Sequence, residues 1–65
     1  MVTFYCSVIV VPNRFVNRKP IKALNMYDAY LKMNDFARRL HRFDPVILVE
    51  RGNAYRYYDK FGKVL

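Results

Sequence analysis

The sequence is poor in the residues that usually carry metals, cofactors or covalent links. It has one cysteine, Cys6, one histidine, His41, and no tryptophan. One cysteine excludes a disulfide within the chain, and one cysteine with one histidine falls short of the about four ligands that a structural zinc ion takes. The two glycines, Gly52 and Gly62, stand singly, which excludes a glycine-rich phosphate-binding loop. We therefore expect no metal site and no cofactor.

Long apolar runs and export signals are missing as well. The apolar N-terminal run, residues 1–11, is far shorter than the roughly 20 apolar residues that span a bilayer. It lacks the basic start and the small-residue cleavage site of a signal peptide. A single cysteine is typical of a reducing compartment. These features predict a cytoplasmic protein that does not enter a membrane.

Acidic residues are scarce. Five Asp and Glu stand against twelve Lys and Arg, which gives a net charge of +7. Such an excess attracts polyanions, namely nucleic acid, anionic lipid or an acidic protein surface. Net charge also keeps small proteins soluble, so the charge alone does not decide between binding and solubility.

The chain is short. Its 65 residues, beginning with Met1, predict a complete short reading frame that folds as a single domain, residues 1–65. A chain of about this length buries only about 60% of the surface that it exposes when unfolded, so its core is marginal. Six Tyr and five Phe supply dense packing, and a homodimer would bury further surface.

Three segments have the pattern of β-strands. Residues 2–11 alternate, are rich in β-branched residues and carry no charge, which predicts a strand in the interior of a sheet. Residues 46–50 are apolar on both faces. Residues 54–59 return as a strand after the turn at residues 51–54, where Gly52 fits a type II′ hairpin. Two shorter features follow: a second turn at residues 59–62 and a short last strand at residues 63–65.

One segment, residues 25–43, has the pattern of a long helix. Asn25 fits the N-cap position, and Asp28 follows three residues later as in a capping box. Pro45 ends the segment because it disfavours helical angles at the preceding residue. Seven apolar residues recur at helical spacing on one stripe, namely Met26, Ala29, Tyr30, Met33, Phe36, Ala37 and Leu40.

The stretch between the first strand and the helix, residues 12–23, contains two prolines and two asparagines, which predicts a connection without regular structure. The predicted order is therefore β-α-β-β, with a fourth strand if residues 63–65 pair. This is an α+β domain in which one long helix packs on one face of a three- or four-stranded sheet. The helix covers one face only, so the other face is open to water or to a partner.

The open sheet face is the first candidate site. Alternation places Tyr5 on it if Phe4 and Cys6 face the helix. Tyrosines beside arginines on a sheet form a platform on which unpaired bases stack, although tyrosine is also common in strands and in dimer interfaces. The hairpin has two orientations, with outward-facing sets Ile47, Val49, Arg56 and Tyr58, or Leu48, Tyr55 and Tyr57.

The second candidate is a set of basic residues from the connection and the helix end. Phosphates bind such clusters with counterion release, which makes binding sensitive to salt. Cations at a helix C-terminus also stabilise the helix dipole, so the connection is the stronger candidate of the two. The set comprises Arg14, Arg18, Lys19, Lys22, Arg38 and Arg42.

The third candidate is a side stripe of the helix that includes Tyr27 and Leu31. A helix with one buried face does not need these apolar residues, and an exposed pair of this kind is a contact for a protein partner. The alternative, which we favour, is that the connection folds over the stripe and buries it under Phe15 or Ile21.

The sequence contains little that indicates a catalytic site. A general base needs an orienting acceptor, and the neighbours of His41 are mainly cations. Cys6 lies among apolar residues, whereas a reactive thiol needs an accessible, electropositive setting. Residues 54–59 resemble the strand of ribosome-dependent toxin nucleases, but this chain is shorter than that family. We expect no enzyme activity and no small-molecule substrate.

Two functions remain. The leading hypothesis is a non-enzymatic protein that binds DNA or RNA through phosphate contacts and exposed tyrosines. The alternative is a protein-interaction module, which could itself be a homodimer, that binds and modulates an acidic host or partner protein. In brevity and composition the chain resembles the small accessory proteins of phages and mobile elements. The residues assigned to nucleic acid are Arg14, Arg18, Lys19, Lys22, Arg38, Arg42, Tyr5, Arg56 and Tyr58, and those assigned to a protein partner are Tyr27, Leu31, Tyr55 and Tyr57.

Overall fold

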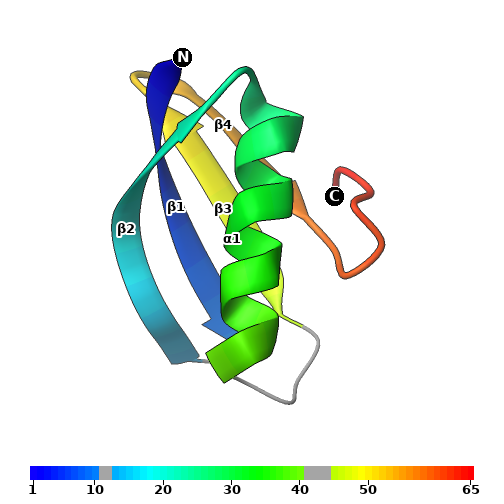
Figure 1. The fold of residues 1–65 in the computed structure, drawn as a ribbon. Helices are drawn as coiled ribbons and strands as arrows, with labels where there is room; N and C mark the ends of the chain where they lie inside the picture. The colour runs from blue at the N-terminus through cyan, green and yellow to red at the C-terminus, as the bar shows by residue number, and fades with distance from the viewer. Residues whose placement is uncertain (11–12, 41–44) are drawn as a thin grey trace.

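A computed structural model describes residues 1–10, 13–40 and 45–65. The strands form one antiparallel sheet of four strands in the order β2-β1-β3-β4. The helix α1 lies against one face of this sheet (Figure 1). The predicted α+β class, with one helix on one face of a sheet, is confirmed. The elements are β1 (Val2–Val10), β2 (Asn13–Ala23), α1 (Met26–Leu40), β3 (Val46–Arg51) and β4 (Ala54–Tyr58).

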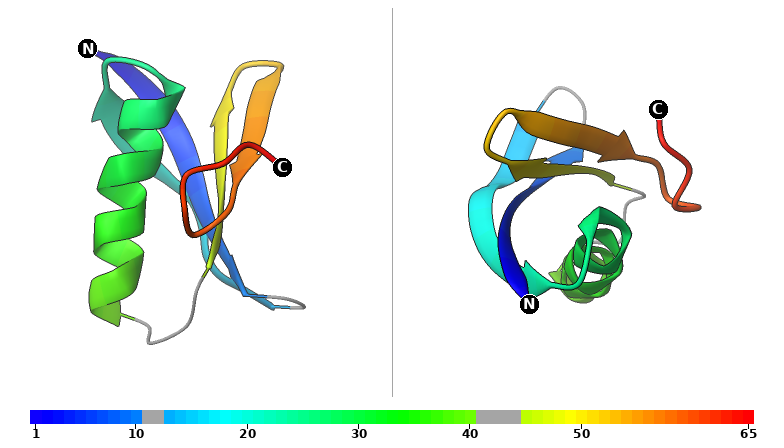
Figure 2. Two further views of the ribbon diagram at one scale, coloured as in Figure 1. Left: turned by 90° about the vertical axis from the view of Figure 1, so that its right-hand side faces the viewer. Right: turned by 90° about the horizontal axis from the view of Figure 1, so that it is seen from above.

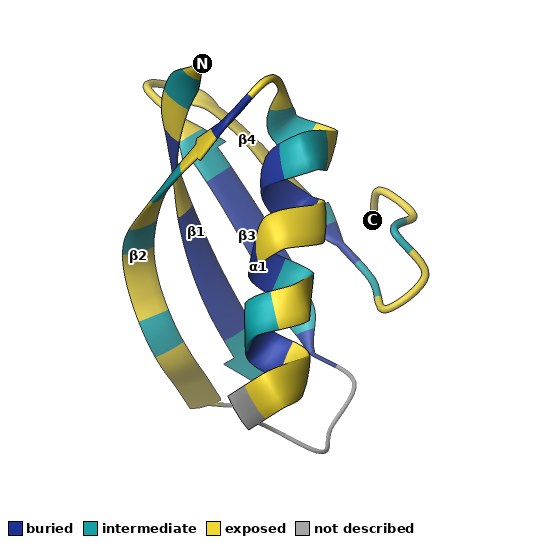
Figure 3. Ribbon diagram, in the orientation of Figure 1, coloured by how far each residue is buried: buried dark blue, intermediate teal, exposed yellow. Residues whose placement is uncertain are grey.

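The core lies between α1 and the two central strands, β1 and β3. The sheet curves around the helix, so that both central strands face it (Figure 2). Burial is concentrated along β1, β3 and the inner side of α1, whereas β2 is largely exposed (Figure 3). Alternating residues of β1, namely Phe4, Cys6 and Val8, pack with Ile47 and Val49 of β3 in one cluster. The condition that places Tyr5 on the open face, namely that Phe4 and Cys6 face the helix, is therefore met.

Residues 13–23 form the strand β2, and the expectation of an irregular connection is wrong. β2 pairs with β1 on one side and lies at the edge of the sheet. An edge strand tolerates Pro20, because the missing N–H points away from the ladder. Two register shifts, beside Val8, absorb extra residues of β2 as bulges. Prolines and asparagines therefore marked an irregular edge strand and not a loop.

The N-terminus of α1 is capped as predicted. The side-chain oxygen of Asn25 accepts a hydrogen bond from the backbone N–H of Asp28 at 2.8 Å, and the Asp28 carboxylate accepts one from the N–H of Leu24 at 2.9 Å. The predicted extension of the helix to residue 43 lies outside the described residues. Of the predicted apolar stripe, the described side chains that are buried or packed against the core are Met26, Ala29, Tyr30, Met33, Phe36 and Ala37.

The hairpin of β3 and β4 has the predicted register, with Val49 opposite Arg56. Gly52 has φ of 58°. Among the described residues other than glycine, only Arg18 has a positive φ, so the φ of Asn53 is negative. This pair of angles is the one that a type II′ turn requires. After β4, the carboxylate of Asp59 accepts two backbone hydrogen bonds at 2.9 Å and closes the second predicted turn. The last residues pair with β4 at one isolated bridge and do not form a full strand.

Candidate functional site

One face of the sheet is left open by the only helix in the described part of the chain (Figure 2). Residues directly opposite each other on neighbouring strands share a face, so the register shows which side chains meet there. Starting where β1 begins, the rows across this open face are Lys22 and Thr3; Pro20, Tyr5, Glu50 and Tyr55; Ser7, Leu48 and Tyr57; and Arg14, Ile9 and Val46.

Arg18 occupies the bulge of β2 beside this face. Its backbone N–H donates to the Oγ of Ser7 at 3.0 Å, and its guanidinium donates to the Oε2 of Glu50 at 2.7 Å. The guanidinium carbon lies 4.9 Å from the centre of the Tyr5 ring. Arg18 has φ of 53°, a left-handed conformation that costs an ordinary residue about 1–2 kcal/mol. These contacts hold the strained backbone and lay the arginine against the tyrosine.

The tyrosines of the open face lie on β1 and on β4, with Glu50 and Leu48 of β3 between them. Tyr5 is 39% exposed and Tyr55 is 64% exposed. The rings of Tyr55 and Tyr57 meet edge to face, with their centres 5.9 Å apart. Neighbouring strands are about 4.8 Å apart, so Tyr5 on β1 and Tyr55 on β4 are separated by roughly 10 Å. The open face thus presents two exposed rings on different strands.

The charges on the open face are mainly positive and follow β2. Arg14 and Lys22 lie toward the two ends of the strand, and both are exposed. Arg14 donates to the neutral side chain of Asn17 at 3.1 Å, and no acid in the described part of the chain forms an ion pair with it. Glu50 is the one acid in the rows of the open face, and it is paired with Arg18. The edge of the face is therefore suited to an anionic ligand.

Four residues predicted to bind nucleic acid do not join this face. Lys19 pairs with Cys6 on the helix side, where its Nζ lies 4.7 Å from the centre of the Phe36 ring. Arg56 pairs with the buried Val49, so it also belongs to the helix side. The last two are Arg38, which is exposed on α1, and Tyr58, which is 1% exposed in the core.

The orientation of the hairpin that turned Arg56 and Tyr58 outward is therefore wrong, and the orientation that exposes Tyr55 and Tyr57 holds. The reason is packing: the Tyr58 ring stacks on Tyr30 of α1 with 4.8 Å between ring centres. Sequence alternation alone left both orientations open, since either one buries apolar side chains. Arg42 lies outside the described residues.

The helix side stripe is exposed, contrary to the expectation that residues 12–23 would bury it. Tyr27 and Leu31 are 49% and 46% exposed. Phe15 is itself exposed, and Ile21 packs against the core from β2. The stripe and the tyrosines of the open face thus belong to different surfaces.

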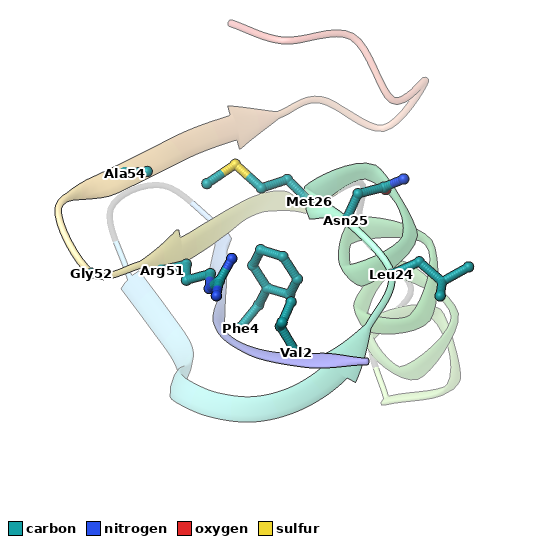
Figure 4. A pocket seen from close by; sticks show the side chains of 8 residues that line it. All are labelled: Val2, Phe4, Leu24, Asn25, Met26, Arg51, Gly52 and Ala54. Carbon is teal, nitrogen blue, oxygen red and sulfur yellow. The ribbon is translucent and has the colours of Figure 1, made fainter.

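A hollow lies where the start of α1 faces the β3–β4 turn (Figure 4). Its volume is about 660 Å³, and its lining is mainly apolar, with Phe4 and Met26 facing it. The charged lining residue is Arg51, whose guanidinium carbon lies 5.9 Å from the centre of the Phe4 ring. The sequence did not predict this hollow, because its walls come from segments that are far apart in the chain.

The described residues offer few groups for other chemistry. Cys6 is fully buried, and burial, with a smaller effect of the Glu50 charge, raises the pKa of its thiol to about 11. Within residues 1–10, 13–40 and 45–65, no three His, Cys, Asp or Glu side chains gather where they could hold a metal ion. No helix in these ranges is long and apolar enough to cross a membrane.

Comparisons with protein-family models, with curated proteins and with solved structures found no match. Function is therefore inferred from the residues of the molecule itself. The open face combines exposed tyrosine rings with the exposed cations of β2.

Proposed function

We propose that this protein binds nucleic acid without catalysing a reaction, and that the open face of the sheet is the contact surface. The observation that carries this proposal is the meeting of Arg14, Arg18 and Lys22 with Tyr5 and Tyr55 on one face. Cations along an edge bind phosphates, and exposed rings stack on bases. The face thus offers a contact to each part of a nucleotide chain.

Solubility alone explains the face less well. Charge that serves solubility need only be spread over the surface, and cations on an edge strand also discourage aggregation. Neither role requires an arginine at φ of 53° that lies against an exposed tyrosine. Strained backbone persists where the surrounding contacts hold it, and it is concentrated at functional sites. This supports a binding role for the Arg18 bulge.

The test compares two double variants of equal charge. Arg14→Gln/Lys22→Gln removes two positive charges from the open face, and Arg38→Gln/Arg39→Gln removes two from α1. Binding of a fluorescent single-stranded oligonucleotide of random sequence is measured by anisotropy across a salt series. We expect affinity to fall steeply with salt, and the open-face variant to flatten the slope of log K against log salt by about 1.4, roughly 0.7 for each lost phosphate contact.

The helix variant should keep the slope, and circular dichroism should show that both variants are folded. If the helix variant weakens binding as much as the open-face variant, net charge and not the face governs binding. If the unmodified protein binds no oligonucleotide at low salt, the proposed function is wrong.

A second candidate function is a protein contact through the opposite surface, of which a homodimer is the simplest form. The observation that favours it is a set of exposed apolar side chains just before α1, on α1 and on the C-terminal turn: Leu24, Tyr27, Leu31 and Phe61. Sedimentation of the protein from micromolar to nanomolar concentration tests the homodimer. A mass that halves on dilution, and a Leu31→Glu variant that is monomeric throughout, would support it; a monomer at every concentration would count against it.

A further inference from the structure

Glu50 is out of place on a face that binds phosphates. Its side chain is 23% exposed, and its neighbours across the open face are Tyr5 and Tyr55. A carboxylate at this position repels a phosphate chain. Its pairing with Arg18 through Oε2 reduces this cost but leaves the second oxygen, Oε1, without a hydrogen bond within the described part of the chain. The position therefore suggests a contact to a part of the ligand other than phosphate.

The sheet geometry places Glu50 where the edge of a base would come. Glu50 lies on β3, one strand from Tyr5 on β1 and one strand from Tyr55 on β4. Each step across the sheet is about 4.8 Å, comparable with the width of a pyrimidine. The ion pair with Arg18 of β2 draws the Glu50 carboxylate across β1 to the side of the exposed Tyr5 ring, so a base that stacks beside Tyr5 brings its polar edge toward the carboxylate.

A carboxylate distinguishes between bases by the hydrogen-bonding groups on their polar edges. Ionised, it accepts hydrogen bonds and donates none. Cytosine presents its N4 amino group as a donor, whereas uracil and thymine present the O4 carbonyl at the same position. Cytosine therefore gains a charge-assisted hydrogen bond, and uracil or thymine brings a second acceptor against the carboxylate.

We propose that Glu50 makes the open face selective for single-stranded nucleic acid with amino-bearing pyrimidines, so that cytosine is bound in preference to uracil or thymine. This inference rests on the proposed function, since it assumes that unpaired bases stack on the tyrosines. Arg18 has a supporting role, because its guanidinium holds the Oε2 of Glu50 at 2.7 Å and so fixes the position of the carboxylate.

The experiment measures the affinity of single-stranded deoxycytidine and deoxyuridine oligomers of equal length, which differ only at this edge. We expect the protein to bind the cytidine oligomer about three- to tenfold more tightly, as one hydrogen bond to a partly exposed charged group allows. Glu50→Gln should bind both oligomers alike and no more weakly than the unmodified protein binds the uridine oligomer. The amide both donates and accepts, and the negative charge is gone.

The matched control is Asp35→Asn, which removes a negative charge that is paired with Arg39 on α1 and should keep the preference. A change in the ligand provides a test that does not depend on how variants fold. An oligomer whose cytosines carry two methyl groups in place of the two N4 hydrogens should bind the protein as weakly as the uridine oligomer does. Equal binding of the two oligomers by the unmodified protein would overturn the role of Glu50 and leave the proposed function standing. A preference that survives in Glu50→Gln would also overturn it. Binding of neither oligomer would instead refute the proposed function.

Discussion

Burial changes the chemistry of Cys6. It is fully buried in the core, and burial first, then the negative charge of Glu50, raises the pKa of its thiol to about 11. The thiolate is the reactive form of cysteine. We therefore expect Ellman's reagent to label the folded protein slowly at about pH 8, and rapidly once denaturant exposes the thiol. Equal rates in both conditions would show that Cys6 is accessible.

The same shift ties stability to pH. The thiol loses its proton near its ordinary pKa of 9.0 in the unfolded chain and near 11 in the folded protein. Between these values the unfolded state binds fewer protons, so the free energy of unfolding falls as pH rises. In urea unfolding, Cys6→Ala should lose less stability than the unmodified protein over this range. Equal losses would contradict the shift.

Arg18 shows where residue-level prediction from the sequence stops. Its positive charge is evident from the sequence, and its contact with phosphate is a proposal. Its φ of 53° and its contacts with Ser7, Glu50 and Tyr5 could not be predicted, because they depend on a bulge whose position is set by the pairing of β1 with β2. Glycine usually marks such positions, and here no glycine gives that signal.

At the scale of elements, the C-terminal turn is tied to α1 through Gly62. This glycine has φ of 82°, and a side-chain carbon built on it would lie 3.1 Å from the Tyr30 ring and 3.2 Å from the Tyr27 ring. Gly62→Ala therefore combines backbone strain with overpacking, and we expect it to lower the free energy of unfolding by about 2–4 kcal/mol.

Gly52 is the matched control, because it also has positive φ, 58°, but open space around it. Gly52→Ala should cost only the backbone part, about 1–2 kcal/mol. Chemical denaturation of the two variants measures the difference. Equal losses would mean that the C-terminal turn does not pack on the helix tyrosines.

Local signals explain which elements could be predicted. The helix start and the hairpin carry their signals within a few residues, in Asn25 and Asp28 and in Gly52, and both were predicted correctly. β2 is formed by pairing with β1, and its own residues, with Pro20 among them, favour a loop. The sequence analysis therefore predicted a connection where the edge strand lies, although it proposed the basic residues of that strand, Arg14, Arg18 and Lys22, as phosphate contacts.

The open face as a whole could be predicted only in part. One helix on one sheet implied an open face, and alternation placed Tyr5 there. The side of the hairpin tyrosines depends on which face of β3 packs on α1, and β3 is apolar on both faces. Leu48 is in fact buried on the open face, opposite Ser7 and Tyr57. The sequence alone therefore left Tyr55 and Tyr58 as equal alternatives.

At the scale of the whole molecule, added salt has two opposite effects on stability. It stabilises the unliganded protein by screening its self-repulsion, and it reduces the stabilisation that a bound ligand gives. Alone, a 65-residue chain with a net charge of +7 repels itself, and salt screens this repulsion, so its melting temperature should hold or rise with salt. A ligand at about a hundred times its dissociation constant adds about 2.7 kcal/mol. For a domain of this size, each kcal/mol moves the midpoint by about 4–8 °C. At low salt, a saturating single-stranded oligonucleotide should therefore raise the melting temperature by roughly 10–20 °C.

This increment should shrink as salt rises, because phosphate contacts weaken with ionic strength, even as the unliganded protein becomes no less stable. Thermal melts followed by circular dichroism, with and without oligonucleotide across a salt series, give both trends in one experiment. Arg14→Gln/Lys22→Gln should show a smaller increment at every salt concentration, because it has lost two of the cations that meet phosphate. An increment that stays constant from low to high salt would mean that the stabilising contact is not electrostatic, and would move the binding surface from the basic edge of the sheet to the exposed apolar side of α1.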